Sequence, residues 1–192
     1  MRATVCLWSD HDYEVHQLDE LPAVAAMQVV MFPVSAKIGL GDALMLHCTP
    51  VRGDEWIGVF ARNHVTGLLA LFSCASPDHF LVVADGRGYF CDAEKPRNSL
   101  ELPCYPIVGV DVAADAELLL VNDSTLVMAL GHDGITWTSG RISWDGITFD
   151  RIDATRAEGL ASDPTGPPRQ FVIELSTGEH QGGSARTGRN GS

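Results

Sequence analysis

The chain has 192 residues, of which 45% are hydrophobic and 20% are charged, and its formal net charge is −12. A chain of this length buries roughly 70% of the surface that its unfolded form exposes, so we expect a single folded domain over residues 1–181. Lysine and arginine are scattered and form no basic run, which argues against nucleic acid as a partner. The negative charge favours a cation or a basic protein surface instead.

The apolar run at the N-terminus is too short for the hydrophobic region of a signal peptide, and acidic residues follow it at once. The uncharged stretch 21–36 is interrupted by Gln28 and Pro33 and falls short of the ~20 residues of a membrane helix. Five cysteines without a CxxC pair are typical of reduced thiols. We therefore predict a cytoplasmic protein with no membrane partner. The sequence does not determine its oligomeric state.

The first half of the chain predicts short strands. Residues 3–8, 44–48 and 56–61 each match a strand, and the last two are joined by a turn over residues 50–55. Residues 21–34 are ambiguous, because an alanine-rich first half suits a helix while the valines of the second half favour a strand. The final segment, residues 182–192, contains no large apolar residue, and we expect a flexible tail.

A repeat begins at residue 68. The segment 68–93 resembles the segment 113–130, and each copy contains a hydrophobic strand followed by a turn pair, Asp85-Gly86 or Asn122-Asp123. A third, looser copy spans residues 149–175, with a turn at 164–168. Repeats of three to four strands are typical of propeller blades. Because propellers usually close with at least ~4 blades, an incomplete propeller or a β-sandwich remains an alternative.

The stretch 132–153 reads HDGITWTSGRISWDGITFDRID and predicts a meander. Asp145-Gly146 is a pair typical of a type I′ hairpin turn, which would place Trp144 opposite Ile147 and give Gly146 a positive φ. On the other face of this hairpin, Arg141 would meet Asp150. One face of the meander is then apolar and turned toward the core, with Ile135, Trp137, Ile142, Trp144, Ile147 and Phe149.

Two resemblances lie in the same third of the chain. The Trp-Asp-Gly segment 144–146 and the ending Thr-Gly-Glu-His-Gln-Gly-Gly at 177–183 resemble a group of uncharacterised bacterial proteins, which implies no activity. The segment 133–137, Asp-Gly-Ile-Thr-Trp, is similar to the Asp-box of sialidase-type propellers, although one residue between Asp and Gly is missing. An Asp-box is a structural turn, so this likeness implies blades and not catalysis.

The densest polar cluster lies at residues 10–16. If this segment is extended, Asp10, Asp12 and His16 share one face and form a candidate site for a divalent metal, with His47 or His64 as further ligands. Neighbouring residues on one strand supply only two ligands to one ion, and the alternative is a solvated acidic loop. Cys48 follows His47 directly, but adjacent residues on a strand point to opposite faces and cannot act as a nucleophile and base pair.

No motif for nucleotide binding or hydrolysis is present in the sequence, and we expect no cofactor other than this divalent metal. The sequence therefore predicts an all-β fold of antiparallel meanders with propeller-like blade repeats. For function it predicts a binding or interaction module with an acidic surface and a protein partner. The alternative function is a small metal-dependent hydrolase whose ligands begin in segment 10–16.

Overall fold

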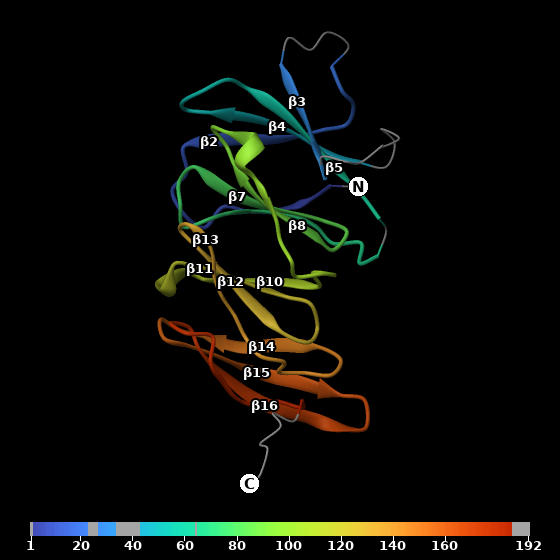
Figure 1. Ribbon diagram of the computed structural model, residues 1–192, viewed down its shortest axis with the longest axis vertical. Coiled ribbons are helices and arrows are strands. Elements are labelled where there is room, and N and C mark those ends of the chain that lie inside the picture. The colour runs from blue at the N-terminus through green and yellow to red at the C-terminus, as the bar shows by residue number, and fades with distance from the viewer. Residues whose placement is uncertain (1, 23–26, 34–42, 64, 186–192) are drawn as a thin grey trace. The chain divides into compact units, whose positions relative to one another are not determined.

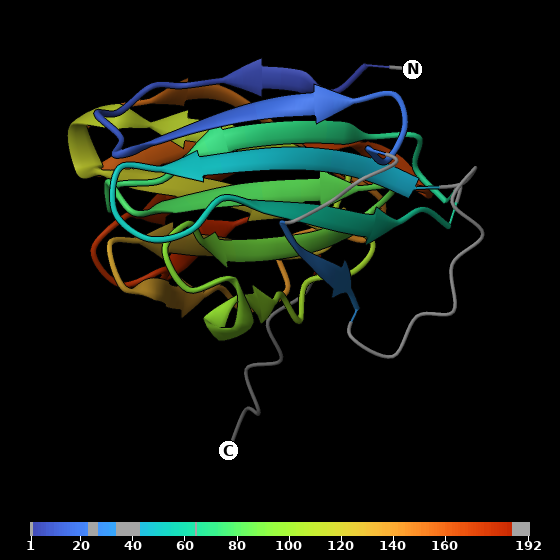
Figure 2. The same cartoon turned by 90° about the horizontal axis from the view of Figure 1, so that it is seen from above.

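The computed structural model describes residues 2–22, 27–33, 43–63 and 65–185 (Figure 1). It clusters into two compact units, unit 1 (Met1–Ile107) and unit 2 (Val108–Ser192), which we treat in turn. Nearly all regular structure is strand, and helix in the described ranges is limited to two three-residue 3-10 segments, η2 (Pro96–Asn98) and η3 (Ala114–Ala116), the short coiled ribbons of Figure 2. None of the helical segments described is long and apolar enough to span a membrane.

Unit 1 contains two sheets that share one core. In sheet A the strand order is β1-β6-β7-β8-β9, and in sheet B it is β2-β4-β5-β3. Most neighbours are antiparallel, but the edge strands β1 and β3 run parallel to β6 and β5. The strands are β1 (Thr4–Cys6), β2 (Tyr13–Leu18), β3 (Gln28–Phe32), β4 (Ala43–Pro50), β5 (Trp56–Ala61), β6 (Leu69–Ser73), β7 (His79–Ala84), β8 (Arg87–Asp92) and β9 (Leu100–Glu101).

Aromatic rings from both sheets meet in the core of unit 1. Trp56 and Phe60 of β5 belong to the same cluster as Phe80 of β7 and Tyr89 of β8. The Trp56 and Phe80 rings stack with centroids 6.2 Å apart, and the Trp56 indole N–H donates to the carbonyl of Ala93 at 2.8 Å. Burying such rings contributes most of the hydrophobic stabilisation available to a small sheet pair, which explains why these strands face each other.

Unit 2 contains two sheets of consecutive antiparallel strands, β10-β11-β12-β13 (sheet C) and β14-β15-β16-β17 (sheet D). A single cluster with Leu120, Trp137 and Phe171 joins them. All residues of the central strands β11 and β12 are buried. The strands are β10 (Gly109–Ala113), β11 (Leu118–Asn122), β12 (Val127–Gly131), β13 (Gly134–Thr138), β14 (Ile147–Ile152), β15 (Arg156–Asp163), β16 (Gly166–Glu174) and β17 (His180–Gly182).

The predicted all-β class with antiparallel meanders is confirmed, and four-stranded meanders of the kind seen in unit 2 are the form of a propeller blade. The two repeat copies correspond to β7-β8 and β11-β12, with turns at Asp85-Gly86 and after Asn122 as predicted. The third copy supplies β14, β15 and β16, although its second turn is shorter and lies at residues 164–165. The second half of segment 21–34 is a strand, β3, and residues 23–26 and 34 lie outside the described residues.

The predicted hairpin at Asp145-Gly146 is wrong. Ile147 pairs with Ala161 of β15, and the residues before the turn belong to a crossover loop, 139–146, between the two sheets. Ser143 explains the difference, because its side chain is fully buried and its Oγ lies 2.7 Å from the carbonyl of Gly146 and 3.0 Å from that of Ser162. These contacts hold the loop in place of strand pairing. Gly146 does have a positive φ, 136°.

The predicted core face of this stretch is correct only in part. Trp137 and Ile142 are buried, and Ile147 and Phe149 pack against the same cluster. In contrast, Ile135 is 39% exposed and Trp144 is 47% exposed. The predicted Arg141 and Asp150 pair does not form across a hairpin, and the Arg141 guanidinium lies over the Trp144 ring at 4.1 Å.

The predicted flexible tail also begins too early. Gly182 is the last residue of β17, and Ser184 and Ala185 are buried. The N–H groups of Ser184 and Ala185 both donate to the carbonyl of Ile142, and the Trp144 N–H donates to Ser184 Oγ. The Trp-Asp-Gly segment and the Gly-Gly ending, which are far apart in sequence, are therefore neighbours in unit 2. Residues 186–192 lie outside the described residues.

Candidate functional site: a groove along strand β3

Strand β3 forms the edge of sheet B. Val30 and Phe32 attach it to the core of unit 1, and the Phe32 ring stacks on Phe60 with centroids 4.6 Å apart. Its second edge pairs with no strand in the part of the chain that the structure describes. An unpaired edge presents a row of backbone N–H and C=O groups to whatever lies beside it.

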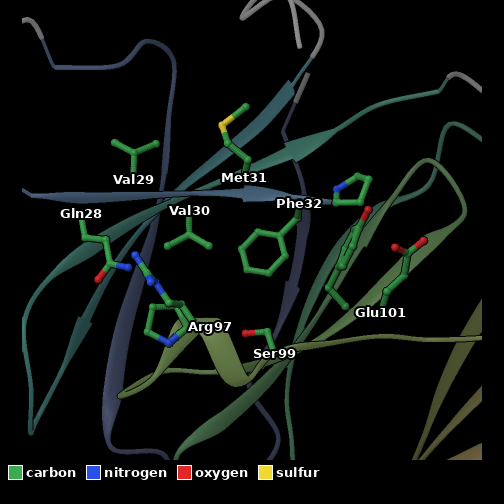
Figure 3. A pocket seen from close by; sticks show the side chains of 11 residues that line it. Gln28, Val29, Val30, Met31, Phe32, Arg97, Ser99 and Glu101 are labelled. Atoms are coloured by element: carbon green, nitrogen blue, oxygen red, sulfur yellow. The ribbon is translucent and has the colours of Figure 1, made fainter. Parts of the chain in front are cut away.

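A cavity of about 600 Å³ lies beside this strand (Figure 3), and we call it the β3 groove. Residues 28–33 form one wall, and the other wall contains Tyr89, Pro96, Arg97, Ser99 and Glu101. All five residues of β3 line the cavity, so it runs along the whole strand. Its volume lies within the range of sites that bind ligands.

Tyr89 brings an unused polar group to this groove. Its side chain is 1% exposed, and its hydroxyl is buried with no hydrogen-bond partner in the structure. Burial raises the pKa of Tyr89 well above its usual range, so the phenol is neutral and can both donate and accept. A buried polar group without a partner costs about 1–3 kcal/mol of stability. A ligand atom that bonds to this hydroxyl would recover part of that cost.

The charged residues of the groove are not equivalent. Glu101 is paired with the guanidinium of Arg87, which lies on the neighbouring strand β8. Arg97 is exposed on η2 and forms no ion pair with any residue that the structure describes. In Figure 3 the Arg97 guanidinium lies beside the Gln28 side chain, whereas Glu101 lies near Phe32. The groove therefore has an available cation at its Gln28 end and a neutralised carboxylate at its Phe32 end.

The residues predicted as metal ligands are not brought together. Asp10 precedes the strand and is exposed, Asp12 lies 3.7 Å from Arg52 Nη2, and His16 Nε2 lies 3.5 Å from Glu14 Oε2. Among the described residues, no group of three or more histidines, cysteines and carboxylates is arranged to hold an ion. A metal at this segment stays a prediction, which calorimetric titration of the wild type and an Asp12→Ala, His16→Ala variant with zinc would test.

The other candidate residues from the sequence analysis, His47 and Cys48, have contacts that serve the fold. His47 lies opposite His16 in the β2-β4 register, and its Nε2 lies 3.0 Å from Glu55 Oε2, while His64 lies outside the described residues. Cys48 points to the other face, as expected, and belongs to the core. Burial raises the pKa of the Cys48 thiol to about 12, which leaves almost no thiolate near neutral pH.

Sequence reasoning missed the β3 groove and both of its distinctive side chains, Tyr89 and Arg97. The groove depends on a parallel pairing between β3 and β5, which are separated in sequence by β4. The only local indication was the ambiguous apolar stretch before Pro33, in which Val29 stays 41% exposed.

Comparison with known proteins adds a distant similarity. No protein-family model matches the chain, and no curated protein matches it. Among solved structures it is similar to the crystal structure of the N-terminal domain of Nup159, with 13% sequence identity and a TM-score of 0.41. The match covers 94% of this chain and 53% of that one, so the chain spans about half the length of its structural neighbour. A likeness this distant assigns no function.

Proposed function

We propose that this protein is a binding module that takes a protein partner in the β3 groove. The observation that carries the proposal is Tyr89, which lines a cavity of about 600 Å³ and whose buried hydroxyl has no hydrogen-bond partner among the described residues. Buried hydroxyls in folded proteins are nearly always bonded, and functional sites are where exceptions gather. The unpaired edge of β3 beside the same cavity supports a polypeptide partner, since strand edges are recognised by other strands.

The cellular location of the module is proposed on the cysteines. All five lie in the described ranges, none of them forms a disulfide, and four of them are buried. Burial raises the pKa of Cys74 and Cys91 as well as that of Cys48, so these thiols are inert parts of the core. Free core thiols suit the reducing cytoplasm. No observation on the described residues favours the metal-dependent hydrolase over the binding module.

Photo-crosslinking tests the proposed module. A photoreactive amino acid is placed at Gln28, which is exposed and lines the groove, or at Val51, which is 71% exposed and lies outside it. The full chain is cross-linked in a lysate of the organism that encodes it. The captured protein is identified, and it is then produced and purified. We expect one protein that is captured from position 28 and not from position 51.

The affinity of the purified partner then decides the proposal. We expect calorimetry to show saturable binding that Gln28→Trp weakens at least tenfold, because the indole fills the end of the groove. The matched variant Val51→Trp adds the same ring outside the groove and should bind like the wild type. Equal capture from both positions, or equal binding by both tryptophan variants, would show that the groove is not the binding site.

A further inference from the structure

We propose that the β3 groove accepts an extended segment of the partner as an added strand, with an aspartate or glutamate side chain of that segment bound by Arg97. This inference rests on the proposed function and specifies the ligand of the same site. It also differs from the expectation that the net charge of −12 raises, which is a basic partner surface.

The edge of β3 sets the conformation of the ligand. Along any strand, alternate residues direct their N–H and C=O groups to opposite sides, so the five residues of β3 leave about two or three such pairs facing the groove. Strand addition satisfies these groups along the whole edge, whereas a helical ligand has free N–H and C=O groups only at its two ends. The ligand is therefore an extended segment that continues sheet B beyond β3.

The charge of the ligand follows from Arg97. Among the described residues that line the groove the only carboxylate is Glu101, which Arg87 already neutralises, and Arg97 has no ion-pair partner among them. Exposed acidic residues further than ~8 Å from the groove are largely screened at physiological salt. The local cation therefore outweighs the negative charge of the whole chain. A guanidinium and a carboxylate form a strong, directional pair, so an acidic residue should lie at the Gln28 end.

The acidic group comes from a side chain and not from a chain terminus. Terminal carboxylates are bound by clusters of free backbone N–H groups. The N–H groups next to Arg97 are already used, because Asn98 N–H donates to Lys95 O at 2.8 Å and Ser99 N–H donates to Pro96 O at 3.3 Å. No cluster of free N–H groups therefore surrounds Arg97, whose side chain can reach an aspartate or glutamate at any position in a longer segment.

The apolar lining of the groove predicts which residues of the ligand flank its acidic residue. Val30 and Phe32 line the groove from β3, and Pro96 lines it from the other wall. Residues two apart on an added strand face the same side, so the residue two positions from the acidic group should be aliphatic or aromatic. The Tyr89 hydroxyl then bonds to a backbone or side-chain group of the ligand within the groove. The predicted ligand pattern alternates, with an acidic residue and apolar residues at every second position.

Selection from a displayed library of random peptides tests this inference on the full chain. We expect enriched sequences to share the alternating pattern and to bind less tightly as salt concentration rises. Arg97→Glu should weaken the best synthetic peptide at least tenfold, and Tyr89→Phe should weaken it about threefold. Arg151→Glu makes the same charge change on unit 2, at a side chain that is 70% exposed, and should leave binding unchanged.

Strand addition has its own readout. Methylating the backbone nitrogens of the peptide one at a time should abolish binding at alternate positions and leave it intact at the positions between them. The inference would be overturned if the enriched peptides lacked an acidic residue, or if Arg97→Glu bound the peptide as tightly as the wild type. It would also be overturned if the methylation series showed no alternation. A dimer of this chain that Gln28→Trp dissociates would overturn it too, since a second copy would then occupy the groove. If the cross-linked partner still depends on Gln28 while Arg97→Glu binds it normally, the module stands and the acidic strand does not.

Discussion

Units 1 and 2 each hold two sheets around a shared core, yet they use their strands differently. In unit 2 every sheet is a meander of consecutive strands, and the crossover loop 139–146 is held by the Ser143 side chain. In unit 1 each sheet has a parallel edge strand, and one of these, β3, borders a groove lined by Tyr89, whose hydroxyl has no partner among the described residues. In unit 2 the loop between the sheets is thus closed by hydrogen bonds, whereas the β3 edge of unit 1 lies open beside a cavity.

The largest expected effect tests whether the stability of unit 2 comes from its buried core and not from the exposed crossover loop 139–146. Trp137 is 8% exposed and its indole N–H donates to Leu175 O at 2.6 Å, so Trp137→Ala should cost about 3–5 kcal/mol of unfolding free energy. Trp144→Ala removes an exposed ring and a contact with Arg141, and should cost about 1 kcal/mol or less. Denaturant titration measures both. A similar loss of unfolding free energy in both variants would show that the loop residue Trp144 stabilises unit 2 as much as the core residue Trp137 does.

The next effect concerns how tightly the ending of unit 2 is fixed. Gly183 has a φ of 91°, and a Cβ there would lie 2.4 Å from the carbonyl oxygen of Ile142. Gly183→Ala should therefore cost about 1–2 kcal/mol from backbone strain, and more because the loop must move. Gly166 starts β16 with space around it, so Gly166→Ala is the matched control with little expected change. A Gly183→Ala protein with the melting temperature of the wild type would show that the ending is not held by the loop.

Two buried tyrosines of unit 1 test whether the Tyr89 hydroxyl contributes to the stability of the fold. The Tyr13 hydroxyl donates to His79 O at 3.2 Å, so Tyr13→Phe should lower stability by about 1 kcal/mol. The Tyr89 hydroxyl has no partner among the described residues, so Tyr89→Phe should leave the unfolding free energy unchanged or raise it while weakening ligand binding. The two changes remove the same atom from equally buried rings. A loss of stability in Tyr89→Phe would mean that the hydroxyl serves the fold and is not reserved for a ligand.

The contrast between the units also explains what could be predicted from the sequence. Strands that pair with their neighbours in sequence are encoded locally, and the apolar runs 80–84 and 118–121 and the turn at Asp85-Gly86 were predicted correctly. The Asp145-Gly146 pair has the same local pattern but ends the crossover loop before β14 instead of closing a hairpin. The buried Ser143 side chain decides this through contacts with Ser162, which no local pattern contains.

The candidate site could not be predicted from the sequence either, because it also depends on contacts between distant segments. The β3 groove depends on the parallel pairing of β3 with β5, which skips β4, and its second wall comes from residues more than fifty positions away. Neither Tyr89 nor Arg97 differs in its sequence context from an ordinary core tyrosine or surface arginine. Their distinctive feature is what they lack, a partner in the described structure, and only the fold shows it.

The smallest expected effect concerns His180 in unit 2, whose buried ring nitrogen Nε2 also has no hydrogen-bond partner among the described residues. Burial lowers the pKa of His180, and Arg156, Glu174 and Glu179 line the cavity beside it. Since the folded pKa lies below the unfolded value of ~6.5, the unfolded state binds more protons between the two, so stability is complete above pH ~6.5 and falls as pH drops through the folded pKa. We expect the melting temperature to fall further between pH 7.5 and 5.5 in the wild type than in His180→Gln, whose other titrating groups are the same. Equal falls would mean that His180 titrates alike in both states and that unit 2 has no strained ionisable group at this edge.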